Sequence, residues 1–143
     1  MIRLMAVKDV PKIMKIERSS FSDPWYPSSF IDDIYNQIGY GIVYEDNDTV
    51  LGYGCMWLMY DEAHITNIAV KESERRKGIG KSLLKALIDK AKSLDYERAL
   101  LEVRTSNTGA IKLYESFGFK IIHTMKKYYI NNDEDGYLME LRF

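Results

Sequence analysis

Residues 75–81 read RRKGIGK and combine two features that bind anions, positive charge and accessible backbone amides. Gly78 and Gly80 lack a Cβ atom, so a ligand can approach the backbone closely. Apolar residues then recur at helical spacing as far as Leu94, which predicts a helix that begins at Ile79. The first amides of a helix have no acceptor within it, and its macrodipole adds roughly half a positive charge there. The segment therefore predicts a phosphate or pyrophosphate site.

The spacing of this turn differs from that of two well-known phosphate-binding loops. A P-loop requires GxxxxGK followed by Ser or Thr, and a dinucleotide-binding turn requires GxGxxG soon after the first strand. Neither pattern is present. The turn reads Arg75-x-x-Gly78-x-Gly80 between an apolar strand that ends at Val70 and an amphipathic helix. By itself this pattern also fits an ordinary helix entry, so the rest of the chain must decide.

A second group of polar residues lies downstream, within residues 101–119. Glu102 interrupts an apolar strand, and Tyr114 lies in a short helix that Asn107 can cap and Gly118 can end. A carboxylate can accept a proton and a phenol can donate one. In isolation, Glu102 would more often face solvent and Tyr114 would more often be a packing residue. The pair therefore gains a functional interpretation only from the motif around it.

The elements that position these groups follow from periodicity and turn residues. Strands are predicted at residues 2–5, 41–44, 50–60, 63–70, 99–104, 118–125 and 137–143. The turn Asn47-Asp48 predicts a hairpin between the second and third strands, and residues 131–136 form the last turn. Helices are predicted after an Asp9 cap, after a cap at Ser28 or Ser29, over residues 79–94, and after Asn107. The order βααβββαβαββ indicates a mixed, mostly antiparallel α/β (α+β) fold with one βαβ crossover.

Length and composition favour a single domain over residues 1–143, because a chain of this size can bury about two thirds of its unfolded surface. The net charge of −1 gives no general attraction to nucleic acid or anionic membrane. Cys55 is the only cysteine, and no Cys/His pairs have metal-ligand spacing, so neither a disulfide nor a metal is expected. Cys55, His64 and His123 are interpreted as structural. With no apolar run of about 20 residues and no signal peptide, we expect a cytoplasmic protein.

Together, the two polar segments resemble the GNAT family of N-acetyltransferases. The resemblance rests on Ile68-Ala69-Val70, the RxxGxG turn, LEVRTSN at residues 101–107 and AIKLYESFGF at residues 110–119. Within that family it is similar to the enzymes that acetylate protein N-termini, the bacterial ribosomal-protein-alanine acetyltransferases and their archaeal relatives. It implies a GNAT fold, a twisted sheet with helices on both faces, and acetyl-CoA as cosubstrate without a metal.

The resemblance also implies roles for individual residues. Glu102 would accept a proton from the amine and Tyr114 would donate one to the departing thiolate. The pantetheine arm would lie along residues 68–70 and the pyrophosphate on the amides of residues 76–81. The implied coenzyme-binding residues are Ile68, Ala69, Val70, Arg75, Arg76, Lys77, Gly78, Ile79, Gly80, Lys81 and Asn107.

On the acceptor side, the resemblance places Trp25 and Tyr128 beside a peptide groove, although Trp25 could equally anchor its loop to the core. The expected acceptor is a protein or peptide N-terminus, such as that of a ribosomal protein, and the enzyme is expected to be a monomer or weak dimer. The alternatives are a GNAT enzyme for lysine or a small amine such as a polyamine or aminoglycoside, and a catalytically silent coenzyme-binding module. Retention of both Glu102 and Tyr114 favours an enzyme.

Overall fold

The computed structural model describes all 143 residues and contains one seven-stranded sheet. The strands are β1 (Ile2–Leu4), β2 (Gly39–Asp46), β3 (Thr49–Met59), β4 (Glu62–Val70), β5 (Arg98–Arg104), β6 (Lys120–Tyr129) and β7 (Glu134–Arg142). The helices are α1 (Val10–Ser20), α2 (Pro27–Tyr35), α3 (Ile79–Ser93) and α4 (Thr108–Ser116), with 3-10 turns η1 (Val7–Asp9) and η2 (Glu72–Glu74). The sheet order is β1-β2-β3-β4-β5-β7-β6, and only β4 and β5 pair in parallel. The predicted order of helices and strands is confirmed. None of the helices has the length and apolarity needed to cross a bilayer.

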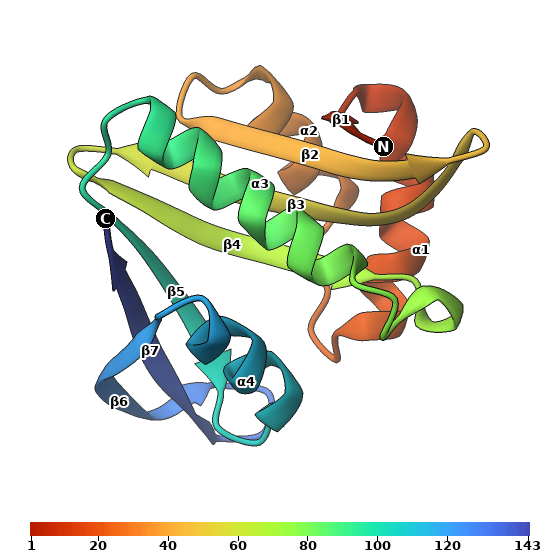
Figure 1. Ribbon diagram of the computed structural model, residues 1–143. Coiled ribbons are helices and arrows are strands. Elements are labelled where there is room, and N and C mark those ends of the chain that lie inside the picture. The colour runs from red at the N-terminus through yellow and green to blue at the C-terminus, as the bar shows by residue number, and fades with distance from the viewer.

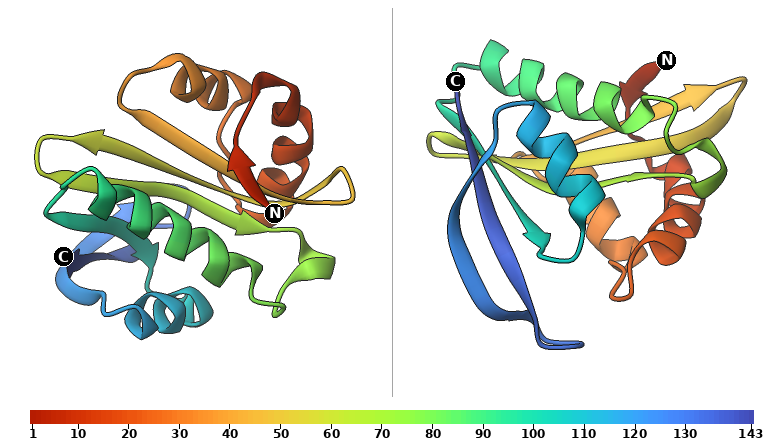
Figure 2. Two further views of the ribbon diagram at one scale, coloured as in Figure 1. Left: turned by 45° about the horizontal axis from the view of Figure 1, so that its top comes forward. Right: turned by 60° about the horizontal axis from the view of Figure 1, so that its bottom comes forward.

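Helices cover both faces of the sheet. Figures 1 and 2 show α3 crossing one face while α1 and α2 lie against the other. The inward residues of α3 form a hydrophobic cluster with the sheet and with Tyr114 and Phe119, and a second cluster packs under α1 and α2. The sheet therefore has an α3 face and an α1/α2 face, and the twisted two-sided arrangement expected from the resemblance is confirmed.

A β-bulge at Thr66 changes which face the residues of β4 reach. The register shifts there, so that Ile65 and Asn67 pair with adjacent residues of β3. Ile65 belongs to the cluster on the α3 face, whereas Ala69 belongs to the cluster on the α1/α2 face. The Asn67 side chain donates hydrogen bonds to Glu17 of α1. The bulge thus directs Asn67 toward α1 just before the segment expected to contact the coenzyme.

The parallel strands β4 and β5 part midway. They pair only where residues 62–65 face residues 98–101, although β4 continues to Val70 and β5 continues to Arg104. Beyond that point β5 pairs with β7 alone, and Figure 1 shows β4 and β5 diverging. The facing edges of the two strands therefore leave backbone groups that can bond to a ligand instead of to each other.

Several local predictions are confirmed at the turns. Asn47 and Asp48 have φ values of 51° and 62°, as a tight hairpin between β2 and β3 requires. Asn107 caps α4, because its side chain accepts a hydrogen bond from the Ala110 amide. Gly118 ends α4 with a φ of 99°. These residues fix both ends of α4 and so the place of Tyr114 within it.

Other details differ from the prediction. Strand β2 begins at Gly39, two residues earlier than predicted, and β6 continues to Tyr129, four residues beyond its predicted end. Helix α2 begins at Pro27, not after Ser28 or Ser29, because the fixed φ of proline suits the first helical position. Asp9 does precede α1, but its carboxylate accepts from the Ala6 amide and from Arg3 instead of from a helix amide. Strand β7 begins at Glu134, three residues earlier than predicted, because pairing with β6 extends into the polar turn.

Candidate active site

The start of α3 is an open row of hydrogen-bond donors. None of the six consecutive amides from Arg76 to Lys81 donates a hydrogen bond within the protein. Arg76 and Gly78 have φ values of 64° and 84°, a left-handed alternation that makes backbone amides converge on an anion. No atom lies within 4 Å of the point where a Cβ on Gly78 would stand. The helix tip is therefore not sealed by any other part of the chain.

The basic side chains around this turn have different roles. Arg75 donates from Nε to the Val70 carbonyl and from Nη2 to Ser20 Oγ, and both distances are 3.0 Å. These hydrogen bonds connect the turn to β4 and α1. Lys77 forms an ion pair with Glu74 at 2.9 Å. Arg75 therefore supports the turn, while the open amides remain available as hydrogen-bond donors.

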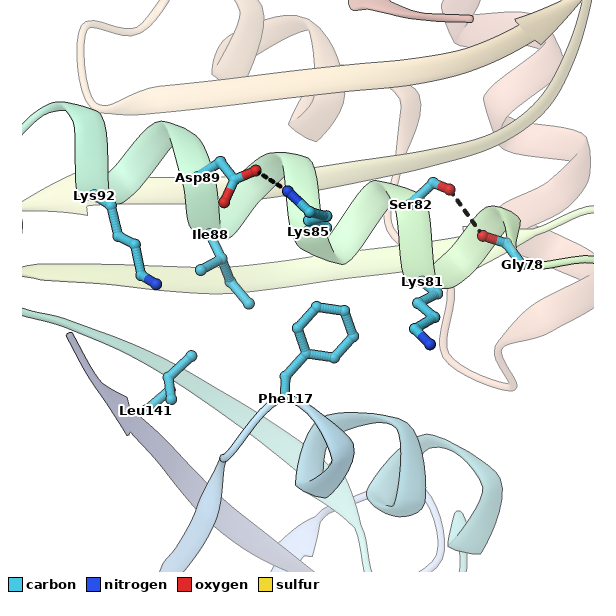
Figure 3. A pocket seen from close by; sticks show the side chains of 9 residues that line it. All are labelled: Gly78, Lys81, Ser82, Lys85, Ile88, Asp89, Lys92, Phe117 and Leu141. Carbon is cyan, nitrogen blue, oxygen red and sulfur yellow. Dashed lines mark hydrogen bonds and ion pairs between the residues drawn. The ribbon is translucent and has the colours of Figure 1, made fainter.

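A groove between α3 and α4 continues from the helix tip. It encloses about 520 Å³. Figure 3 shows Phe117 and Leu141 facing Ile88 across the groove, with Lys81 and Lys92 extending into it from α3. Its lining residues are Gly78, Lys81, Ser82, Lys85, Ile88, Asp89, Lys92, Phe117 and Leu141. An apolar floor with cationic edges suits the aromatic ring and phosphates of a nucleotide.

Tyr114 lies in the α3-face cluster, where its side chain is 7% exposed and its ring meets that of Phe119 at 5.9 Å between centroids. Its hydroxyl makes no hydrogen bond within the protein. The hydroxyl oxygen is also not fully buried, so a ligand can reach it. Burial raises the pKa of Tyr114 to about 12. The hydroxyl is therefore protonated near neutral pH and free to donate.

Glu102 lies on the other face of β5, where it meets His64. The distance from Glu102 Oε2 to His64 Nε2 is 2.6 Å, and both side chains are about one quarter exposed, at 23% and 26%. The hydrogen bond to Glu102 raises the pKa of His64 above its ordinary value. The Trp57 ring meets the His64 ring edge-on. Glu102 and Tyr114 thus belong to opposite faces, and no hydrogen bond joins them.

The interpretation of His64 as structural missed this contact. A parallel register in which Ile65 faces Leu101 places His64 and Glu102 on the same face of adjacent strands. The sequence contains both strands, and a parallel pairing of them would have suggested the contact. His64, a polar residue in an otherwise apolar strand, was the signal in the sequence that could have indicated this contact.

The predicted acceptor-side aromatics lie on the α1/α2 face with Glu102. The Trp25 ring stacks 6.3 Å from Trp57, and its backbone amide donates to Glu17 at 2.9 Å, so Trp25 is anchored yet remains partly exposed. Tyr128 is 46% exposed, and its pKa is raised first by partial burial and then by the charge of Glu102. Trp25 and Tyr128 thus both lie on the side of the carboxylate.

Arg104 connects the loop before α2 to the turn after β6. Its guanidinium lies 4.1 Å from the centre of the Tyr129 ring and donates to Asp23 at 3.4 Å and to Asn131 at 3.0 Å. Asn131 in turn donates to Ser22 Oγ at 2.9 Å. These contacts join the loop that carries Trp25 to the end of β6 that carries Tyr128, which are the two predicted sides of the peptide groove. Arg104 was not predicted as a site residue, although it lies on the same face of β5 as Glu102.

No group of three or more His, Cys, Asp or Glu side chains is arranged to hold a metal ion. Cys55 is 1% exposed within the cluster under α1 and α2, and burial raises the pKa of its thiol, as its interpretation as a core residue requires. The chemistry available at the site is therefore that of amides, one phenol, one carboxylate and one imidazole.

Comparison with known proteins identifies the family. Residues 10–119 match the family model described as Acetyltransferase (GNAT) family. The chain is 32% identical over 142 residues to the ribosomal protein bS18-alanine N-acetyltransferase of Escherichia coli K12, covering 98% of this chain and 95% of that protein. It is 33% identical over 151 aligned residues to an N-alpha-acetyltransferase of Sulfurisphaera tokodaii, covering 96% and 90%. The crystal structure of the E. coli ribosomal-protein-S18-alanine N-acetyltransferase superposes with a TM-score of 0.92 at 30% identity, covering 99% and 92% of the two chains. The chain belongs to the GNAT acetyltransferase family.

Proposed function

We propose that this acetyl-CoA-dependent N-acetyltransferase acetylates the N-terminal α-amine of a protein or peptide. The observation that supports this most directly is the open tip of α3, whose six free amides lead along the parted edge of β4 toward the His64–Glu102 pair. A donor bound at the tip and an acceptor bound at the pair would meet where β4 and β5 separate.

The free amides from Arg76 to Lys81 would hold the pyrophosphate of the coenzyme, because they lack protein acceptors and lie at the positive end of the α3 dipole. The open edge of β4 at residues 68–70 would hold the pantetheine arm through backbone hydrogen bonds, and the groove between α3 and α4 would take the nucleotide. Asn107 Oδ1 is used in capping α4, which leaves its amide nitrogen to contact the coenzyme. When bound, acetyl-CoA supplies a thioester whose carbonyl carbon is attacked by the amine.

The chain's own residues would then move two protons. The acceptor amine must lose a proton, which the Glu102 carboxylate would take, directly or through His64 or a water molecule. The departing sulfur must gain a proton, which the Tyr114 hydroxyl would donate. A backbone amide near Val70 would polarise the carbonyl oxygen. The amine attacks directly, so no covalent bond to the protein forms.

An α-amine suits this arrangement better than lysine does. The pKa of a peptide α-amine is about 7.7 to 8.0, so roughly 10 to 15 per cent is already neutral at pH 7, whereas lysine at about 10.4 is almost fully charged. The acceptor side is aromatic, and its carboxylates Asp23 and Glu134 are both engaged by Arg104. Glu102, the other carboxylate on this side, is paired with His64. A polyamine or aminoglycoside would favour a strongly acidic surface of unpaired carboxylates, which these three paired groups do not form.

A peptide panel tests the proposal. The protein is incubated with acetyl-CoA and peptides that have a free α-amine, matched peptides with a blocked N-terminus and an internal lysine, and spermidine. Mass spectrometry locates the label while thiol release measures turnover. We expect label on α-amines only. Label chiefly on lysine or spermidine would favour the small-amine or lysine alternative, and coenzyme binding without thiol release would favour a silent module.

A further inference from the structure

Helix α1 carries a carboxylate into the core. Glu17 is 1% exposed, and no cationic side chain lies within ion-pair distance of it. Three donors surround it instead. The Tyr53 hydroxyl donates to Oε1, the Trp25 backbone amide donates to Oε2 over 2.9 Å, and Asn67 Nδ2 lies 3.2 Å from both oxygens. Each donor comes from a different part of the chain.

A buried carboxylate at this position carries a desolvation cost. Burial of a charge without a counterion is unfavourable unless hydrogen bonds replace water, and an apolar side chain of similar volume often stabilises a fold as well or better. The other inward positions of α1, including Ile13 and Ile16, are apolar. Unlike an apolar side chain, Glu17 fixes the positions of specific donor groups, because each of its two oxygens accepts hydrogen bonds from them.

The donors belong to the two sides of the proposed reaction. Trp25 lies in the loop that borders the acceptor groove, and its ring stacks on Trp57 beside His64. Asn67 directly precedes the β4 segment that would hold the coenzyme, and it reaches α1 only because of the bulge at Thr66. One buried carboxylate therefore connects the acceptor loop to the coenzyme strand.

We propose that Glu17 is a positioning residue for the acceptor. It holds the loop that carries Trp25 against β4, so that weakening this hydrogen bond lowers acceptor affinity and leaves coenzyme affinity unchanged. The inference rests on the proposed function, in which Trp25 borders the acceptor groove. Glu17 itself touches neither substrate, because it is enclosed in the core.

The separate use of the two oxygens makes the inference testable. In Glu17→Gln a single oxygen remains. When this oxygen accepts from the Tyr53 hydroxyl, the new NH2 group faces the Trp25 amide and cannot accept from it. Tyr53→Phe removes the competing hydroxyl but leaves Oε2 for Trp25. In the double variant Glu17→Gln/Tyr53→Phe, the remaining oxygen is again available to Trp25. Positioning therefore predicts rescue of acceptor binding in the double variant, although that variant lacks more hydrogen bonds.

Steady-state kinetics with a peptide acceptor, together with coenzyme titration, measure the effect. For Glu17→Gln we expect the acceptor KM to rise about tenfold, as for partial loss of one hydrogen bond to a charged group. We expect kcat to change less than about threefold and coenzyme affinity to stay within about twofold. Tyr53→Phe should keep the acceptor KM within about twofold, and the double variant should restore it to within about threefold of wild type.

Amide exchange gives a readout that does not depend on turnover. In the wild type, the Trp25 amide should exchange as slowly as core amides, and in Glu17→Gln its exchange should become at least about tenfold faster. Fast exchange at Trp25 in the wild type would overturn the inference without any variant. The inference would also be overturned if the acceptor KM rose further in the double variant than in Glu17→Gln, because the KM would then follow the loss of stability. If no peptide is acetylated by the wild type, the proposed function fails, and exchange still decides whether Glu17 holds the loop.

Discussion

The two faces of β5 are built in different ways. On the α3 face, the proposed coenzyme side takes its residues from two continuous segments, 68–94 and 101–119, which are held by apolar packing and offer mainly backbone donors. On the α1/α2 face, the proposed acceptor side is assembled from distant segments through polar side chains. His64 and Glu102 are 38 positions apart, and Ser22 and Asn131 are 109 apart.

This difference implies different sensitivities. A site made of backbone amides tolerates most side-chain changes around it, because no single side chain supplies its donors. A site made of polar contacts between distant segments depends on each contact, since every lost partner leaves another polar group unsatisfied. We therefore expect acceptor binding to be easier to alter by single substitutions than coenzyme binding.

The largest expected effect concerns the one side chain of the α3 face that takes part in the proposed chemistry. Tyr114→Phe removes the proton donor but keeps the ring that packs against Phe119. We expect kcat to fall about 100-fold or more, with coenzyme affinity within about twofold of wild type. Tyr137→Phe, a partly buried tyrosine that packs on the same cluster, is the matched control and should retain activity. Equal activity in both variants would remove Tyr114 from the mechanism.

A somewhat smaller effect is expected on the opposite face. Glu102→Gln should lower kcat/KM about 100-fold at neutral pH, because the amide cannot accept the proton. It also removes the carboxylate whose hydrogen bond and charge raise the pKa of His64. The residual activity should therefore persist to lower pH than in the wild type, where kcat/KM falls as the pH decreases through the raised pKa. The test is the ratio of kcat/KM for Glu102→Gln to kcat/KM for the wild type, measured from pH 5.5 to 9. Titration of the acceptor amine affects both enzymes equally and cancels in this ratio. Unshifted profiles would separate His64 from the reaction.

The same comparison explains what the sequence could predict. The α3 face was predictable because its signals are local. The helical period from Ile79, the glycines of the turn, and the caps of α4 at Asn107 and Gly118 each act within a few residues. Even the open amides follow from where the helix begins, since every helix starts with unpaired donors.

The α1/α2 face was only partly predictable, because its contacts depend on the register between strands. Glu102, Trp25 and Tyr128 were identified by resemblance, but the partners of Glu102 and Trp25 were not. The contact between His64 and Glu102 requires the parallel pairing of β4 and β5. The contact of Asn67 with α1 requires the bulge at Thr66, and no local pattern in the sequence marks that bulge.

A moderate effect is expected where the acceptor walls meet. Arg104→Lys keeps the positive charge but cannot stack on Tyr129 and donate to Asp23 and Asn131 at the same time. We expect the acceptor KM to rise about fivefold with unchanged coenzyme affinity, measured by steady-state kinetics and titration.

Arg98→Lys provides the matched control. Arg98 lies at the other end of β5 and also pairs with two carboxylates, those of Glu62 and Glu140. Its replacement should affect stability without changing the acceptor KM. If both variants raise the acceptor KM equally, the effect belongs to β5 as a whole and the special role of Arg104 is wrong.

The smallest effect is thermodynamic and concerns the ion pair of the α1/α2 face. The folded pKa of His64 is raised by its hydrogen bond to Glu102, so the pair stabilises the fold fully below the unfolded value of about 6.5. The stabilisation disappears as the pH rises through the folded pKa. Urea unfolding of wild type and His64→Gln should therefore differ by about 1 kcal/mol more at pH 5.5 than at pH 9. His123→Gln, at an exposed position on β6 without an ion pair, is the matched control. A difference that stays constant with pH would mean that His64 contributes through packing against Trp57 and not through its charge.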